Sequence, residues 1–97
     1  MTTVLNIDLI VSNPAVRGGQ PSIAGTGIRV VDVAVLHTFG GLTAEDIAVQ
    51  LRLNLGQVHA ALAYYYTHQT ELDAQLRSNA EQAEHWRQVL QEQGRLF

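Results

Sequence analysis

The first apolar stretch of the chain alternates between apolar and polar positions. Within residues 4–11, positions 5, 7, 9 and 11 are Leu, Ile or Val, while positions 6 and 8 are Asn and Asp. A period of two predicts a half-buried strand. Ser12-Asn13-Pro14 ends this strand. In the glycine-rich segment that follows, strand-like pieces at 21–24 and 28–31 flank Gly25-Thr26-Gly27, which predicts a β-hairpin.

The spacing of apolar residues lengthens from Asp32 onward to about three and a half residues, which predicts helices. We expect Asp32 to cap a first short helix that runs through Phe39. The Gly40-Gly41 pair then ends it.

Reciprocal capping signals mark the starts of two further helices. Thr43 is followed three residues later by Asp46, and Asn54 is followed in the same way by Gln57. A tight turn at 52–54 joins these helices, which predicts a tri-helical helix-turn-helix. The buried stripe of the third helix is predicted to consist of Val58, Ala61, Leu62 and either Tyr65 or Tyr66.

The segment 71–93 contains neither proline nor glycine and is predicted to be one long helix. Its mainly apolar seam repeats every 3.5 residues and comprises Leu72, Leu76, Asn79, Ala83, Trp86, Leu90 and Gln93. The predicted fold class is therefore α+β, mainly α. A hairpin and helix-turn-helix domain spans 1–70, and an amphipathic interaction or dimerisation helix spans 71–97.

Charge and composition narrow the possible functions. The 97 residues carry a net charge of −3, all six basic residues are arginine, and cysteine is absent. The absence of cysteine excludes disulfides, thiol catalysis and cysteine-ligated metals. The net charge argues against a self-sufficient nucleic-acid binder, because phosphate neutralisation supplies much of the affinity of such proteins. No signal peptide or membrane-spanning run is recognisable, so we expect a soluble cytoplasmic protein without a membrane role.

Residues 13–30 read Asn-Pro-Ala-Val-Arg-Gly-Gly-Gln-Pro-Ser-Ile-Ala-Gly-Thr-Gly-Ile-Arg-Val and resemble the signature of the family called domain of unknown function 433. The segments 41–48 and 58–68 continue the resemblance, which covers about residues 5–73. It implies a small helix-turn-helix domain of DNA-binding type, preceded by a β-hairpin. Such proteins are often proposed to be antitoxins encoded beside PIN-like nuclease toxins. The family has an arginine where this chain has Gly27; either Arg29 replaces that arginine or its role is lost.

The third helix is the candidate recognition helix, because the second helix of such a motif reads base edges near its N-terminus. Side chains in and around it that suit phosphates or bases are candidates for contact with operator DNA. These candidates are Arg29, Arg52, Gln57, His59, Tyr64 and Thr67. The alternative is that the helices only pack on each other and that the outer face, smooth at Ala60 and Ala63, binds nothing.

The C-terminal helix is the candidate partner-binding element. An antitoxin helix can lie along a nuclease and present an arginine to the acidic, metal-binding active site. The candidate residues are Leu72, Leu76, Arg77, Trp86, Arg87, Leu90, Arg95 and Phe97. The equally weighted alternative is a homodimer seam in which Asn79 sets the register.

Enzymatic and cofactor chemistry find little support in the sequence. None of the four histidines forms a recognisable ligand pair or nucleophile motif, and the adjacent Glu45 and Asp46 suit a helix start. We therefore expect no metal, no cofactor and no enzyme activity. The first hypothesis is an antitoxin that neutralises a PIN-like nuclease and binds its own operator. The open edge of the N-terminal strand also predicts a homodimer. The alternative is a stand-alone homodimeric regulator or interaction module.

Overall fold

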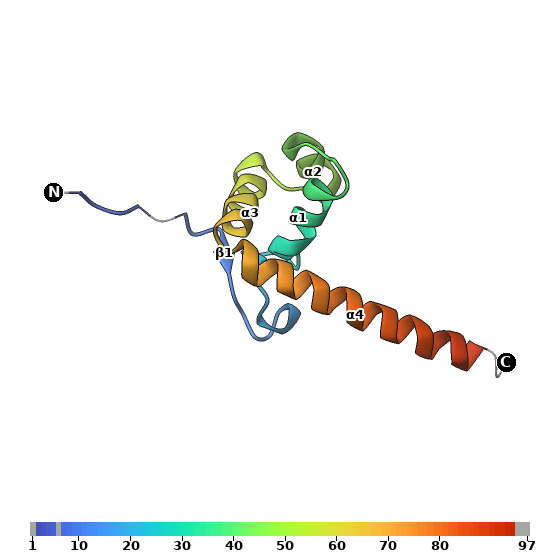
Figure 1. The fold of residues 1–97 in the computed structure, drawn as a ribbon. Coiled ribbons are helices and arrows are strands. Elements are labelled where there is room, and N and C mark those ends of the chain that lie inside the picture. Colours follow the sequence, from blue (N-terminus) through green and yellow to red (C-terminus); the bar gives the residue numbers. More distant parts are fainter. Residues whose placement is uncertain (1, 6, 95–97) are drawn as a thin grey trace.

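A computed structural model describes residues 2–5 and 7–94 of the chain. Four helices follow a short N-terminal region with two strands and one 3₁₀ turn (Figure 1). The elements are β1 (Ile10–Val11), η1 (Arg17–Gly19), β2 (Ser22–Ile23), α1 (Val30–Thr38), α2 (Ala44–Leu51), α3 (Leu55–Thr67) and α4 (Gln69–Gly94). This arrangement confirms the predicted α+β, mainly α class.

The two strands form a small antiparallel sheet beside the helices. Ile10 pairs with Ile23 in this sheet, and Val11 pairs with Ser22. The predicted turn after Ile23 is also present, because the Ile23 backbone N–H donates to the Ile28 carbonyl at 2.9 Å. The segment 28–31 adds only an isolated bridge to the sheet before α1 begins, so the two named strands are β1 and β2.

The predicted strand over 4–11 is wrong for most of its length. The structure gives it only the two residues of β1, and Leu5 and Ile7 are 86% and 72% exposed. The reason lies in the partner strand. β2 contains two residues before the chain turns at Gly25, and the Ala24 N–H still donates to the Leu9 carbonyl at 2.8 Å, but positions before Leu9 have no strand to pair with in the described chain. Alternation alone does not hold a strand in place without backbone hydrogen bonds from a neighbour.

The start of α1 also differs from the prediction. The residue that precedes the helix is Arg29, and Asp32 lies within the first turn. The Asp32 carboxylate still contributes to the cap, because it accepts the Arg29 backbone N–H at 2.9 Å. The helix ends at Thr38, and the chain then turns through Gly41, whose φ of 68° suits glycine.

Both predicted capping boxes are confirmed. Asp46 and Thr43 exchange side-chain to backbone hydrogen bonds of 3.1 and 3.3 Å, and Gln57 and Asn54 exchange bonds of 2.8 and 2.9 Å. Between the two helices, Arg52 adopts a left-handed conformation and its N–H closes the end of α2. The tight turn between α2 and α3 is therefore where the sequence placed it.

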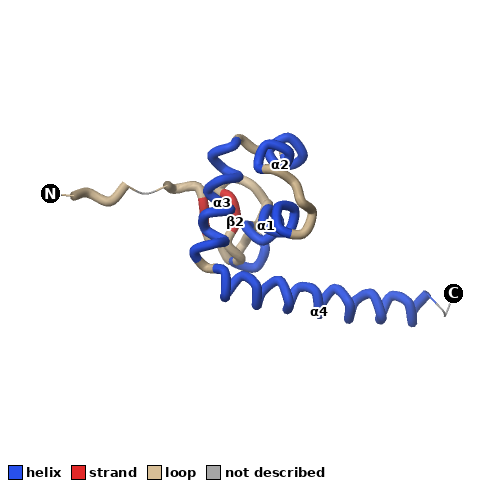
Figure 2. The backbone as a smooth tube through the Cα atoms, turned by 45° about the horizontal axis from the view of Figure 1, so that its top comes forward, coloured by secondary structure: helices blue, strands red, loops and turns tan. Residues whose placement is uncertain are grey.

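The core is formed where α3 packs against α1 and α2, with β1 and β2 alongside (Figure 2). The predicted stripe of α3 is buried, and Tyr65 completes it while Tyr66 remains exposed. The fully buried side chains of largest volume are Ile23, Val30, Val33, Ile47 and Val58.

The long helix α4 leaves this body in a straight line (Figure 1). It begins two residues earlier than predicted, after a break at His68, where φ is −119° and ψ is 34°. Leu72 is buried in the core, and the Tyr65 hydroxyl donates to an Asp73 carboxylate oxygen at 2.7 Å. That hydrogen bond, together with burial, raises the pKa of Tyr65 above 10. The division of the chain at residue 70 stays a prediction, since Leu72 ties the first turn of α4 to the core.

Replacing Ile47 tests the core directly. Ile47→Ala removes a fully buried side chain from the packing of α2 and is expected to lower the free energy of unfolding by about 3 kcal/mol. Val49→Ala on the same helix is the matched control, because Val49 is 81% exposed and its loss is expected to cost less than about 0.5 kcal/mol. Urea denaturation measures both; equal effects would contradict the described orientation of α2.

Candidate functional site

The Arg29 guanidinium is held by the protein itself. It donates from Nη2 and Nε to the Asp32 carboxylate at 2.8 and 3.2 Å, and from Nη1 to Gln20 Oε1 at 3.0 Å. These contacts fasten the segment before the hairpin to the start of α1. A DNA phosphate would have to compete with Asp32 for this cation, so Arg29 is poorly placed as a phosphate contact.

The neighbouring arginines lower the pKa of Asp32. Burial raises the pKa of its carboxyl group, but hydrogen bonds from the Arg29 side chain and backbone, with the positive charges of Arg29 and Arg17, outweigh burial and lower it below 3.8. Arg17 also donates to the Gly27 carbonyl at 3.3 Å. Sequence reasoning missed Arg17, although its position before Gly18-Gly19 was a signal for a turn that folds back on the hairpin.

The candidates at the start of α3 have different surroundings. Gln57 accepts the Asn54 N–H at 2.9 Å through Oε1, so its carbonyl oxygen is already used in the cap. Arg52 is exposed at the end of α2, and His59 is exposed on α3. The open surface near the α3 N-terminus therefore offers one guanidinium and one imidazole.

The candidates at the end of α3 belong to a different environment. Tyr64 stacks on His68 with ring centroids 4.1 Å apart, and the Thr67 hydroxyl donates to the Ala63 carbonyl at 2.5 Å. A shallow hollow here is lined by Tyr64, Thr67 and His68 together with Ile7 and Ile10 from the N-terminal segment. The α3 candidates therefore lie in two different places. Those at the start of α3 are open, whereas those at its end lie beside Ile7 and Ile10 from the beginning of the chain.

The charge of the helical unit disfavours bulk attraction to DNA. Residues 30–68 contain three carboxylates, which are Asp32, Glu45 and Asp46. The same segment contains one arginine, Arg52. Counterion release from phosphates requires cations on the protein surface. The segment 30–68 supplies one arginine cation per chain.

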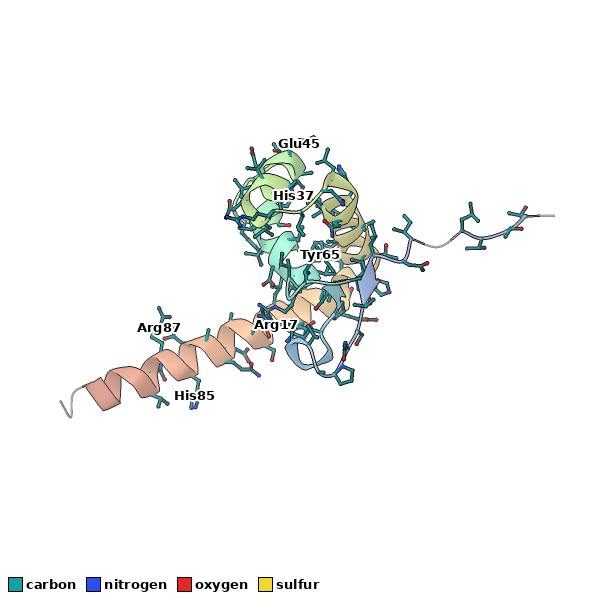
Figure 3. The ribbon with its side chains drawn as sticks, turned by 180° about the vertical axis from the view of Figure 1, so that it is seen from behind. Arg17, His37, Glu45, Tyr65, His85 and Arg87 are labelled. Atoms are coloured by element: carbon teal, nitrogen blue, oxygen red, sulfur yellow. The ribbon has the colours of Figure 1, made fainter. Side chains whose placement is uncertain are left out.

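The partner-binding candidates are spread along α4. Leu72 is buried in the core and Leu76 is half-buried beside it. Arg77 is exposed, and exposed Arg87 forms an ion pair with Glu84. Figure 3 shows Arg87 far along α4, away from Tyr65 in the body. The side chains of Trp86 and Leu90, and the whole of Arg95 and Phe97, lie outside the described residues.

An apolar groove occupies the angle between α4 and the rest of the molecule. We call it the elbow groove; its apolar lining includes Val35, Leu36 and Phe39 from α1 and Leu76, Ala80 and Ala83 from α4. Phe39 is 76% exposed. Sequence reasoning missed Val35 and Phe39 as surface residues. The sequence did indicate this surface, because the apolar residues of α1 extend around more of the helix than a single buried stripe requires.

Two further features bear on the class of site. Among residues 2–5 and 7–94, no three His, Asp or Glu side chains gather closely enough to hold a metal ion. None of the helices in this part of the chain combines the length and apolar character that a membrane span requires.

The fold is a small α+β domain in which three helices pack together beside a two-stranded sheet and a long fourth helix projects. The family model described as protein of unknown function (DUF433) matches residues 10–65, and the chain belongs to this family. The match begins at β1 and ends at residue 65, in the last turn of α3 and before α4. Comparison with curated proteins and with solved structures finds no match.

Removing the Asp32 carboxylate tests the cluster at the start of α1. Asp32→Asn is expected to lower the free energy of unfolding by about 1 kcal/mol at pH 7, because a charged acceptor of three N–H groups becomes neutral. The folded pKa lies below the unfolded value of about 3.9, so the stabilisation is present above that value and is lost as the pH falls through the folded pKa.

Urea denaturation between pH 7 and pH 2 measures the difference between the Asp32→Asn variant and the unchanged chain. This difference should shrink below about pH 4. Asp8→Asn, at an exposed position of the N-terminal segment, is the control and should change nothing. A difference that stays constant with pH would contradict an ionised Asp32 in the folded protein.

Proposed function

We propose that this protein is the antitoxin of a toxin–antitoxin module and that α4 neutralises a PIN-like nuclease. The observation that carries the proposal is a helix that projects from a small body and exposes Arg77 and Arg87. Membership of the family supports it, because proteins of this kind are proposed to accompany such nucleases. We propose no catalytic activity for the chain itself.

Two exposed arginines of α4 suit an acidic target, and they act locally because the helix as a whole carries five carboxylates. Arginine binds carboxylates through two parallel N–H groups, and a nuclease that uses metal ions gathers carboxylates at its active site. Arg77 and Arg87 lie ten residues apart, or about 15 Å along a helix, so one helix can place a guanidinium in the site and a second on its rim. Arg87 is paired with Glu84 in the free chain, but both side chains are exposed, so breaking this ion pair to release the guanidinium costs little.

Operator binding is the second candidate, and Arg52 is the observation that favours it. This arginine is exposed in the turn that leads into α3, where a phosphate of the DNA backbone passes in a helix-turn-helix complex. With one such cation per chain, binding would require two copies on neighbouring half-sites. A stand-alone homodimeric regulator would use the same residues without a nuclease.

Truncation after Ser78 tests the antitoxin role. The shortened chain keeps Leu72 and Leu76, so its circular dichroism should retain the signal of α1 to α3, while co-purification of the nuclease and inhibition of its RNA cleavage should be lost. Arg77→Glu in the full chain is expected to weaken inhibition at least ~10-fold. Ser78→Glu adds the same negative charge next to it without removing a guanidinium, and should weaken inhibition less. Undiminished inhibition by the truncated chain would contradict the proposal.

Arg52→Ala tests operator binding separately. Fluorescence anisotropy with a duplex from the promoter region of the gene, between 50 and 200 mM salt, should give a salt slope smaller by about 0.9 per chain when this phosphate contact is removed. Gln50→Ala, also exposed near the end of α2, is the matched control. Identical slopes for all three proteins would exclude Arg52 as a DNA contact.

A further inference from the structure

The break between α3 and α4 has no cause in the local sequence. Residues 57–93 contain neither glycine nor proline, and His68 is the one residue between the two helices. Helices often end at a glycine in the left-handed conformation or before a proline, and the next helix begins after a side chain that caps its first N–H groups. His68 has a φ of −119° and is not a capping type of residue. Contacts outside the backbone therefore hold the bend.

The backbone at the break is close to that of an unbroken helix. The His68 N–H donates to the Tyr64 carbonyl at 3.0 Å, and the Leu72 N–H donates to the His68 carbonyl at 3.0 Å, both with the spacing of an α-helix. Within the described chain, the N–H groups of residues 69–71 have no backbone acceptor, and these residues are exposed. Joining the two helices would pair these N–H groups with the carbonyls of residues 65–67.

Two contacts at the start of α4 hold the bend. Leu72 is 4% exposed and lies in the same core as Tyr65, and the Tyr65 hydroxyl donates to Asp73 at 2.7 Å. That hydrogen bond requires the bend, because a straight helix would separate residues 65 and 73 by about 12 Å along its axis. Leu72 and Leu76 are the residues of the described part of α4 that join the core, and the rest of the helix extends away from the body (Figure 1). The first two turns alone therefore fix the direction of α4.

We infer that His68 is a hinge and that this protein has a second state in which α3 and α4 form one continuous helix. Leaving the bent state gives up the burial of Leu72 and the hydrogen bond between Tyr65 and the Asp73 carboxylate. The continuous helix gains three backbone hydrogen bonds in return. These opposing contributions are similar in size, so the bent state is favoured by a small difference that a binding partner can reverse.

The two states present different surfaces. In the bent state α4 lies opposite Val35 and Phe39 and forms one wall of the elbow groove, which Arg77 also lines. In the continuous helix α4 points away from α1, so the groove is lost and Leu72 joins Leu76 on an exposed seam. A partner that fills the groove therefore favours the bent state, and a partner that binds the whole seam favours the straight one. This switch does not depend on a nuclease partner.

Distances between two spin labels distinguish the states. Because the chain has no cysteine, His59→Cys on α3 and Gln82→Cys on α4, both at exposed positions, give one defined pair of labels in the full chain. A continuous helix separates these positions by about 35 Å, since each residue adds about 1.5 Å, and the bend makes the distance shorter. The labelled chain without further changes should give mainly the shorter distance.

Removing one hydroxyl group should shift the population. Tyr65→Phe deletes the hydrogen bond to Asp73 but keeps the ring in the core, so the ratio of the long to the short distance should rise at least ~5-fold. Tyr66→Phe is the matched control, because it removes the same group from the next residue, whose side chain is 54% exposed, and should leave the ratio unchanged. Adding Leu72→Ala to Tyr65→Phe should make the distance near 35 Å the major one.

Proline identifies the second state as a continuous helix. Thr70 lies in the first turn of α4, where proline is tolerated, whereas the same proline inside a continuous helix would clash with the preceding turn. In the variant that combines Tyr65→Phe and Leu72→Ala, Thr70→Pro should therefore remove the distance near 35 Å, and Thr70→Ala should keep it. Circular dichroism checks that each variant remains folded. Equal ratios for Tyr65→Phe and Tyr66→Phe, or a long distance that survives Thr70→Pro, overturn the inference.

Discussion

The junction between α3 and α4 decides the surfaces that this molecule presents. Leu72 is buried in the same core as Tyr65, and the Tyr65 hydroxyl bonds to Asp73 one residue later. Because the chain breaks at His68 just before this contact, α4 cannot continue the axis of α3 and leaves at an angle. That angle creates the elbow groove and carries the exposed arginines away from the body.

The sequence predicted structural features that depend on residues close together in the chain. It missed features that depend on contacts between distant segments. The caps at Thr43 and Asn54 were predictable because each requires only a residue three positions later. The strand over 4–11 was wrong because pairing depends on the length of β2, which alternation does not report. Arg29 was a DNA-contact candidate by residue type alone, whereas its contact with Gln20 depends on how the segment before the hairpin folds back. The elbow groove was not predictable, since the direction of α4 relative to Val35 and Phe39 follows from the junction.

Electrostatics separates the two kinds of partner. Residues 30–68 have three carboxylates and one arginine, and α4 has five carboxylates and two exposed arginines, Arg77 and Arg87, so both parts of the chain are net acidic. Long-range attraction to DNA therefore has little to act on, but a local site of carboxylates can bind an arginine that a helix delivers to it.

The apolar seam of α4 and Arg77 occupy different stripes of the helix. A seam every 3.5 residues occupies one stripe, and Arg77 lies outside that stripe because it follows Leu76 by one residue, about 100° around the helix. Arg77 nevertheless lines the elbow groove beside Ala80, so a partner that fills the groove also meets this guanidinium.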